Sequence, residues 1–478
     1  MHDTHLDTES GKDILTTRRK AFLVNIDPKR YGTFAEIGAG QEVVRWFFQA
    51  GGAAGTISKS ISAYDMQVSD AIYGVCERYV CQERLEDMLD YEMKLNKERL
   101  AAQRGHRTAF FAFADTVKAA SYKGTGECHG WMGIKFQSHP HDDDSQIIIH
   151  VRMLDKENQA QQEALGIVGV NLIYGACFHF HDPEKLISSL LDNLSTARIE
   201  IDMIEFSGIE FRHVDNRLMS LQLVQLGLSS AAMFGPDGTV LQPSESLYKK
   251  NILVERGSFR PVCLSNSDII RAARERFLKE EDVREEDICV LMELTMNNLM
   301  ATGQIDYQDF LARADLLQAA GHTVLISDYF EYYRLAAYLA RFTKRKIGIC
   351  MGAISLAELF DEKYYKNLEG GILESFGRLF KNDLKLYIYP YRDRTTGSLL
   401  TTDNLEIATH LKKLYGYLLD RGNIEQLSNH DPAALTVFSR DILKRIAEGD
   451  SAWEKMVDPR VATLIKERCY FGYCTKGD

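Results

Sequence analysis

A glycine-rich stretch near the start of the chain could hold a phosphate group. In "GGAAGTISKS", residues 51–60, three glycines permit close approach of the backbone to a ligand, and Lys59 adds a positive charge. The lysine does not follow the glycines directly, as it does in a P-loop, so the stretch predicts a simpler anion cradle. An earlier glycine turn, residues 38–40, is flanked by Glu36 and Glu42, whose carboxylates would repel a phosphate.

The aromatic residues between these two turns favour a different hypothesis. Trp46, Phe47 and Phe48 are consecutive and cannot all lie on one face of a helix. At least one of them is therefore expected to contact another subunit or domain, with the glycines letting backbones approach. An anion site at Lys59 and a subunit contact at the aromatic residues remain as alternatives.

Arginines and lysines later in the chain are further candidates for binding an anion. Arg217 lies in the first turn of a helix that Asp215 is expected to begin, where the helix dipole does not favour a cation. A bound carboxylate or phosphate would explain this arginine, and so would an ion pair with Glu205 or Glu210. The stretch "SESLYKKNILVERGSFR" adds four cations that could clamp a polyanion or protect a solvated strand edge: Lys249, Lys250, Arg256 and Arg260. Glu205 and Asp215 are the candidate acid, base or metal-binding groups.

Two histidines could bind a transition metal. In "FHFHDPEK", His179 and His181 would lie on the same face of a strand, because side chains repeat every two residues. A helix is expected to follow from Asp182 and Pro183. The second H-x-H pattern, "SHPHDDD", is more typical of a polar hairpin turn. The nine cysteines form an odd set without a C-x-x-C pair, which fits neither a disulfide framework nor a zinc ribbon.

The elements that position these residues alternate between strand and helix. Residues 105–265 predict a mixed, partly antiparallel sheet domain, and residues 321–395 predict a second α/β block built from βαβ units. In that block "TVLIS" and "KIGIC" are expected to be neighbouring parallel strands. Ser327 then lies at the carboxyl end of a strand, where α/β sheets bind ligands, unless it simply caps the next helix.

The other parts of the chain complete the predicted domain organisation. The predicted fold class is α/β, with a mixed sheet domain, a second α/β block and helical N- and C-terminal segments. The remaining ranges are a flexible tail over 1–20, a helical N-terminal region over 21–104, a helical connection over 266–320 and a helical C-terminal region over 396–478. Within the range 21–104, "AFLVNID" is expected to be a short strand. The boundary between lobes is expected near 265–290.

Composition excludes several classes of function. The chain has 478 residues and a formal net charge of −11, which argues against broad nucleic-acid or anionic-membrane binding. No apolar run approaches the roughly 20 residues of a membrane span. The first residues alternate in charge and lack the apolar core of a secretory signal, so a cytoplasmic location is expected.

Four segments resemble a bacterial family of cytosolic proteins: "YGTFAEIGAGQEVVRWFFQAGGAAGTISKSISAYDM", "RIEIDMIEFSG", "VDNRLMSLQLVQLG" and "LVERGSFRPV". The resemblance extends from about residue 22 to about residue 395. Members of that family carry two conflicting labels, TonB-dependent receptor and nicotinate-nucleotide adenylyltransferase. Neither label fits these residues. Such a receptor has a signal peptide, a plug domain and some twenty-two alternating strands, and such an adenylyltransferase has an H-x-G-H signature, which "CHGW" and "AGHT" only approach.

Together these patterns predict a cytoplasmic protein that binds a nucleotide or another phosphorylated metabolite. Nucleotidyl or phosphoryl transfer is the reaction that such a site could support. The alternative is a self-assembling structural or scaffold protein without catalysis, in which glycine-rich and aromatic surfaces serve subunit contacts. A homo-oligomer is the expected state. No motif indicates a cofactor or fixes a reaction.

Overall fold

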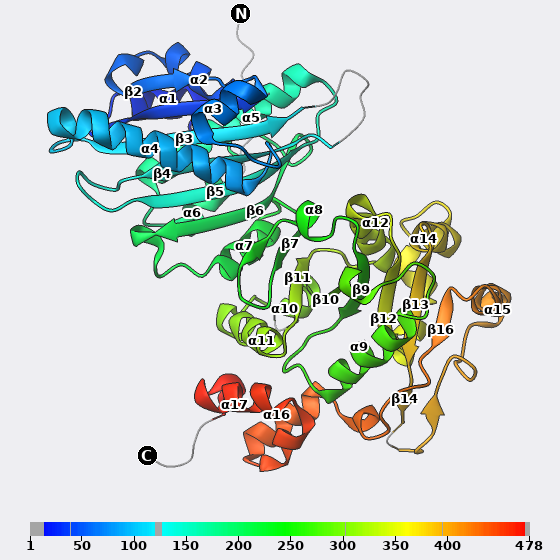
Figure 1. Cartoon of the computed structure of the whole chain (residues 1–478). Coiled ribbons are helices and arrows are strands. Elements are labelled where there is room, and N and C mark those ends of the chain that lie inside the picture. Colours follow the sequence, from blue (N-terminus) through cyan, green and yellow to red (C-terminus); the bar gives the residue numbers. More distant parts are fainter. Residues whose placement is uncertain (1–13, 39, 120–126, 302, 394, 474–478) are drawn as a thin grey trace, which may run out of the picture. The chain divides into compact units, whose positions relative to one another are not determined.

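The computed structural model describes residues 14–38, 40–119, 127–301, 303–393 and 395–473. The chain divides into two compact units, unit 1 over residues 1–229 and unit 2 over residues 230–478 (Figure 1). Most of the predicted tail of residues 1–20 lies outside the described residues, and helix α1 begins before the end of that range. Within the described ranges, every helix is too short or too polar to cross a bilayer.

Unit 1 contains a six-stranded mixed sheet in the order β2-β1-β3-β4-β5-β6. Strand β1 pairs in parallel with both β2 and β3, whereas the pairs from β3 to β6 are antiparallel. The strands are β1 (Arg30–Gly38), β2 (Ile57–Ile61), β3 (Ala109–Lys118), β4 (His129–Phe136), β5 (Ser145–Met153) and β6 (Ile199–Gly208). The helices are α1 (Thr17–Asn25), α2 (Val43–Ala50), α3 (Met66–Tyr73), α4 (Gln82–Arg104), α5 (Asn158–Phe178), α6 (Pro183–Ser189) and α7 (Asn216–Gln225).

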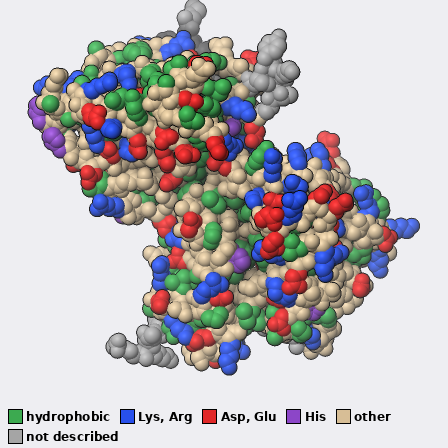
Figure 2. Space-filling view, viewed as in Figure 1, with side chains coloured by type: hydrophobic (Ala, Val, Ile, Leu, Met, Phe, Trp, Pro, Cys, Tyr) green, Lys and Arg blue, Asp and Glu red, His purple; other side chains and the backbone are tan. Residues whose placement is uncertain are grey.

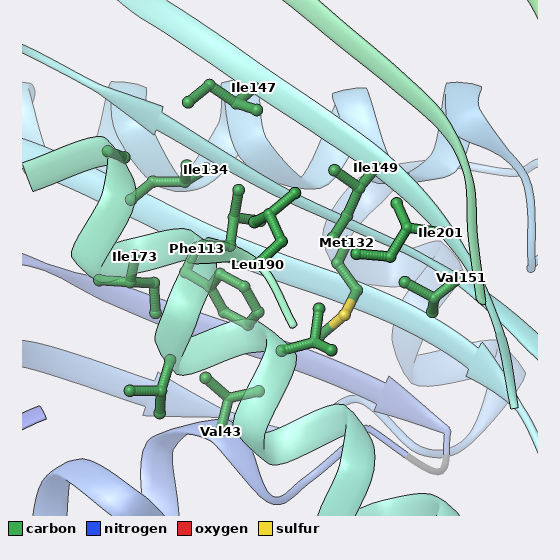
Figure 3. Packing of buried hydrophobic residues seen from close by; sticks show 14 of the residues in the cluster. Val43, Phe113, Met132, Ile134, Ile147, Ile149, Val151, Ile173, Leu190 and Ile201 are labelled. Carbon is green, nitrogen blue, oxygen red and sulfur yellow. The ribbon is translucent and has the colours of Figure 1, made fainter. Parts of the chain in front are cut away.

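Helices cover both faces of the unit 1 sheet. Met132 of β4 and Ile149 of β5 pack with Val43 of α2 and Ile173 of α5 in the main core (Figure 3). Gly133 points to the opposite face because side chains alternate along a strand. A side-chain carbon there would lie 2.9 Å from Leu89 Cδ1 of α4. The sheet is therefore enclosed between α4 on one face and α2 and α5 on the other.

Unit 2 contains an eight-stranded sheet in the order β16-β13-β12-β9-β10-β11-β7-β8. The six strands from β16 to β11 in this order are parallel, and β7 and β8 add an antiparallel edge. The strands are β7 (Ala231–Phe234), β8 (Val240–Leu241), β9 (Asn251–Arg256), β10 (Ile288–Thr295), β11 (Thr323–Ser327), β12 (Ile347–Gly352), β13 (Leu384–Tyr389) and β16 (Ile424–Gln426). A separate hairpin consists of β14 (Tyr391–Arg392) and β15 (Leu399–Leu400).

The parallel part of this sheet is doubly wound. From β9, the chain adds β10 and β11 on one side and then crosses over to add β12, β13 and β16 on the other. The helices of unit 2 are α8 (Pro243–Ser246), α9 (Leu264–Phe277), α10 (Met296–Leu299), α11 (Tyr307–Ala319), α12 (Tyr332–Phe342), α13 (Ala353–Leu359), α14 (Gly371–Leu379), α15 (Lys412–Asp420), α16 (Ser439–Glu448) and α17 (Pro459–Glu467). The strand order reverses between β9 and β12, which is where doubly wound sheets form a crevice.

The structure confirms the predicted α/β class and corrects two of the predicted elements. "TVLIS" and "KIGIC" are the parallel strands β11 and β12, but they are not neighbours, because β9 and β10 lie between them. "AFLVNID" is not a strand, since most of it belongs to helix α1. The physical reason is the cap that precedes it, where the Thr16 hydroxyl accepts a hydrogen bond from Arg19 N at 3.3 Å.

The predicted ranges also differ from the observed units. The range 21–104 contains β1 and β2 of the first sheet as well as helices. The range 266–320 contains β10, a strand inside the second sheet, in addition to its helices. The division between the two units falls at Ser229 and Ser230, before the expected 265–290. Charged helices such as α9 resemble a linker in sequence, yet here they cover a sheet.

Candidate functional site

A cavity of about 400 Å³ lies at the carboxyl edge of the unit 2 sheet. Its wall begins where β9 and β10 end and continues over the loop that follows β11 and over α13 after β12. The residues that line the cavity include Arg256, Thr295, Asn297, Asn298, Phe330, Glu331, Tyr332, Glu358 and Tyr364. The cavity is thus at the point where the strand order reverses.

Arg256 in the cavity wall is held by a buried carboxylate. Its Nε donates to Glu293 Oε2 at 2.7 Å and its Nη2 donates to Glu293 Oε1 at 3.0 Å. The hydroxyl of Ser327 donates to the same carboxylate at 2.5 Å. Burial disfavours the guanidinium charge, but the charge and hydrogen bonds of Glu293, together with Tyr332 and Glu331, outweigh burial, so the pKa of Arg256 is raised. Strands β9, β10 and β11 supply one residue each to this network.

The guanidinium of Arg256 keeps hydrogen-bonding capacity for a ligand. Its Nη1 donates to the carbonyl oxygen of Phe330 at 2.6 Å, and its central carbon lies 4.3 Å from the centre of the Tyr332 ring. Arginine has five N–H donors, and the bond to Phe330 and the two bonds to Glu293 use three of them. The remaining donors are fixed in direction by the bidentate pair.

Amide and aromatic groups complete the cavity. Asn298 Nδ2 donates to the carbonyl oxygen of Gly257 at 3.0 Å and so holds the turn after β9. The neighbouring Asn297 is exposed. The Phe330 and Tyr364 rings lie 5.5 Å apart and are tilted by 52°. Oε2 of Glu331 is buried without a hydrogen-bond partner among the described residues. The cavity therefore offers donors, acceptors and ring faces together.

Of the predicted anion-binding residues, the structure brings Arg256 and Ser327 together through Glu293. Lys249 and Lys250 lie at the other end of β9, and a strand of six residues spans about 20 Å. Lys250 Nζ donates to the carbonyl oxygen of Glu286 at 3.0 Å, and Lys249 lies beside the Tyr248 ring. Arg260 pairs with Asp309 at 2.5 Å. The four cations of this stretch therefore do not form one cluster, because β9 separates them.

The predicted residues in unit 1 are engaged in local pairs. Lys59 Nζ lies 2.5 Å from Glu92 Oε2, and Glu205 accepts a hydrogen bond from Gln82 Nε2 at 2.9 Å. Asp215 caps α7 and pairs with Arg217, whose Nη2 lies 2.7 Å from Asp215 Oδ2.

The position of Arg217 in the first turn of α7 therefore has a local explanation. Burial alone would raise the pKa of Asp215, but the bonds from Arg217 hold it below its usual value. This arginine is compensated by the residue that caps its own helix.

Two carboxylates, those of Glu36 and Asp115, lie beside the first glycine turn. Glu36 accepts hydrogen bonds from Val43 N at 2.9 Å and Val44 N at 3.3 Å and so caps α2. A side-chain carbon at Gly40 would lie 2.0 Å from Asp115 Oδ1, so only glycine fits against that carboxylate. Burial raises the pKa of both Glu36 and Asp115.

The aromatic residues after this turn have different surroundings. Phe47 is buried in the core of unit 1. Trp46 is partly buried and packs against the same core. The third, Phe48, is 55% exposed. A subunit contact at this helix, if it forms, would involve Phe48 first.

The two candidate metal-binding histidines do not lie on a strand. Helix α5 continues to Phe178, and His179 is its C-terminal cap, with His181 in the following turn. The described ranges contain no cluster of three or more His, Cys, Asp or Glu residues that could hold a metal ion. Desolvation by burial lowers the pKa of His179.

Several residues of the cavity, and Glu293 behind Arg256, were not predicted from the sequence. Glu293 stands inside the apolar strand "CVLMELT", and an acidic residue within a buried strand indicates a partner, since an isolated buried charge is unstable. The sequence could therefore have indicated that Glu293 has a buried partner. Asn297, Tyr332 and Tyr364 follow ordinary helix and turn patterns, and only the folded sheet brings them to one cavity.

Comparisons with known proteins give limited information. No protein-family model matches the chain, and no protein of curated function matches it. A CinA superfamily protein from Klebsiella pneumoniae is similar in structure at 12% identity, covering 34% of this chain and 99% of that one, with a TM-score of 0.26. A CinA superfamily protein from Enterobacter cloacae is similar at 13% identity, covering 37% and 99%, with a TM-score of 0.26. These similarities carry no functional conclusion for this chain.

Proposed function

We propose that unit 2 binds a nucleotide or a related phosphorylated metabolite in the cavity at the carboxyl edge of its parallel sheet. The position of the cavity carries this proposal, because it lies where the strand order reverses between β9 and β12. Loops diverge at that point of a doubly wound sheet and leave a crevice for a ligand. The cavity volume of about 400 Å³ is within the range of roughly 300–1,000 Å³ that small-molecule sites occupy.

The groups in the cavity match the parts of a nucleotide. The Phe330 and Tyr364 rings offer faces for a base. The carboxylates of Glu331 and Glu358 can accept hydrogen bonds from ribose hydroxyls, as acidic residues do in dinucleotide sites. Arg256 has donors left for one phosphate group. With one cation and two carboxylates in the wall, a monophosphate or a dinucleotide fits better than a triphosphate.

The proposal is tested by isothermal titration calorimetry with adenosine monophosphate, adenosine, adenosine triphosphate and a nicotinamide dinucleotide. Asn297→Ala and Tyr364→Leu change the wall outside the buried ion pair, and each should weaken binding about tenfold, the effect of losing roughly 1.4 kcal/mol. Lys249→Ala is the matched control, because Lys249 lies at the opposite end of β9 and should leave affinity unchanged. Absence of saturable binding by all four ligands, or equal binding in all three variants, would contradict the proposal.

Phosphoryl or nucleotidyl transfer is a second step of this proposal. Magnesium ions bind nucleotides through phosphate oxygens and one or two protein carboxylates, and Glu331 and Glu358 are the carboxylates of the wall. A magnesium ion held by these carboxylates would offset the additional charge of a triphosphate. Incubation with magnesium and adenosine triphosphate should then release phosphate or pyrophosphate, by transfer to water, in the wild-type protein and not in Glu358→Gln. Equal release by both proteins would show that the activity does not belong to this cavity.

We also propose self-assembly as the alternative function, because unit 1 exposes a group of apolar side chains. Tyr64 is 76% exposed and Val75 is 88% exposed, and Met66 and Val68 on α3 between them are exposed as well. Exposed apolar patches of this kind serve subunit contacts. Size-exclusion chromatography with light scattering should find an oligomer that Met66→Glu/Val68→Glu dissociates, whereas Lys59→Ala leaves it intact. A monomeric wild-type protein would end this alternative.

A further inference from the structure

Two histidines and an aspartate form a hydrogen-bonded chain across three strands of unit 1. Asp202 Oδ1 on β6 lies 2.6 Å from His150 Nδ1 on β5. His150 Nε2 lies 3.0 Å from His129 Nδ1 at the start of β4. Asp202 and His150 are buried, whereas His129 is partly exposed. The chain therefore runs from a buried carboxylate to an imidazole at the surface.

The direction of these hydrogen bonds follows from the chemistry of the carboxylate. An ionised carboxylate only accepts, so His150 Nδ1 carries the proton of the first bond. If the His150 ring carries only that one proton, its Nε2 has a lone pair and accepts a hydrogen bond from His129 Nδ1. His129 Nε2 is left with a lone pair as the outer end of the chain. Burial is the main cause that lowers the pKa of His129 to about 4, so this ring is neutral at pH 7.

Packing holds this arrangement in place. The buried Trp131 ring meets the His150 ring edge-on, with the ring centres 4.9 Å apart. His129 and Trp131 are two residues apart on β4 and share one face of the sheet. The imidazole orientations are thus set by neighbours that cannot easily move.

The surface end of the chain lies between two cations. Lys118 on β3 and Arg152 on β5 are the cross-strand partners of His129. Arg152 is compensated by Glu200 and lies 3.4 Å from Glu127. Lys118 is exposed and forms no ion pair with a described carboxylate. Lys118 therefore brings a positive charge to the strand position directly opposite His129.

We propose that unit 1 holds a small-anion site, in which Lys118 attracts a tetrahedral oxyanion and His129 Nε2 accepts a hydrogen bond from a protonated oxygen of that anion. Hydrogen phosphate has this chemistry, either free or as a phosphate monoester that retains one proton. Sulfate has the same shape but no proton at neutral pH, so it leaves the lone pair without a donor. The site is distinct from the cavity of unit 2 and does not depend on it.

Selective ¹⁵N labelling of histidine tests the proposal in the full chain. Inorganic phosphate at about pH 8, where a monoester is fully ionised because its second pKa is near 6, should shift the His129 Nε2 resonance. Sulfate should bind about tenfold more weakly. A sugar phosphate that binds only below about pH 6 would identify the monoester monoanion as a ligand. A sugar phosphate that binds equally well at about pH 6 and about pH 8 would contradict the role of the proton.

Variants separate the charge from the acceptor. Lys118→Ala should weaken phosphate and sulfate by the same factor, whereas His129→Ala should abolish the preference for phosphate. Asp202→Asn keeps the shape of the positioning residue, and it should change the His129 tautomer in the ¹⁵N spectrum and reduce the preference. His139→Gln, at an exposed histidine beside Asp142, is the control and should change neither. A protonated Nε2 in the neutral wild-type ring, or equal affinity for phosphate and sulfate, would overturn the proposal.

Discussion

Buried carboxylates in the two units have opposite surroundings. Glu293 in unit 2 accepts two hydrogen bonds from Arg256 and one from Ser327. Asp115 in unit 1 lies directly opposite Glu36 on the neighbouring strand, and no cation among the described residues pairs with it. The first carboxylate is compensated as an ion, whereas the second sits beside a like charge.

The difference shows how each sheet handles a buried acid. A carboxylate with a bidentate arginine remains ionised, because the partner replaces the lost hydration. Burial disfavours the charge of both facing carboxylates, and repulsion from Glu36 adds to this effect at Asp115, so the pKa values of both groups rise. The ionised pair can orient a ligand, whereas the raised pKa values favour the protonated form of the two facing carboxylates at neutral pH. This contrast can be tested by substitution and by pH.

The largest effect is expected from removing the arginine. Arg256→Met should reduce the free energy of unfolding by about 3–5 kcal/mol, because it leaves Glu293 buried without its cation. Urea unfolding of unit 2 measures this loss. The double variant Arg256→Met/Glu293→Gln should recover part of it, since the uncompensated charge is then gone. A loss below about 1 kcal/mol would mean that Glu293 is not held as an ion.

Isosteric amide substitutions should act in opposite directions at the two carboxylates. Glu293→Gln should lower the free energy of unfolding by roughly 1–3 kcal/mol, because Arg256 loses its acceptor. Asp115→Asn should raise it by about 1–3 kcal/mol near pH 8, because the amide needs no proton and can donate to Glu36. Both values come from the same denaturant titration. The same sign for both variants would remove the contrast.

The stability of unit 1 should fall as the pH rises. The folded-state pKa values of Glu36 and Asp115 are raised, so between their ordinary values and the raised ones the folded state binds more protons than the unfolded state. This stabilisation of the folded state is fully present at pH values below the ordinary carboxyl pKa. It is lost as the pH rises towards the raised pKa values, by about 1.4 kcal/mol per pH unit for each proton.

Unfolding midpoints measured from acid to mildly alkaline pH check this slope. Asp115→Asn should make it shallower. Glu255 in unit 2, whose pKa burial raises to about 8, gives a slope of the same sign, so the comparison is made in a Glu255→Gln background. A slope that does not change in Asp115→Asn would show that this carboxylate ionises freely.

The smallest effect is expected at the surface. Arg460 Nε lies 3.0 Å from Asp458 Oδ1, and the arginine side chain is 63% exposed. Water screens this pair, so Arg460→Ala should leave the urea midpoint unchanged within error. The variant also serves as the matched arginine control for Arg256→Met. A clear loss of stability here would mean that burial does not explain the difference between the two arginines.

Much of the fold could be predicted from local patterns. The apolar runs that became β4 and β5 and the helical spacing that became α4 were recognisable in the sequence. Short apolar runs were less informative. "AFLVNID" has the composition of a strand, and the cap at Thr16 makes most of it helix. Strand order was not predictable in the same way, because it depends on where each strand finds a partner in the assembled sheet.

The sequence by itself identified Ser327 as a candidate at the end of a strand and Arg256 as a candidate anion-binding cation in a basic stretch. Only the tertiary structure decided that they meet at Glu293, because β10 lies between their strands. The same holds for His129, His150 and Asp202, which are far apart in the chain and are joined by the antiparallel register of three strands. Spacing along the chain predicts neighbours within one element, whereas contacts between elements depend on packing of the whole sheet.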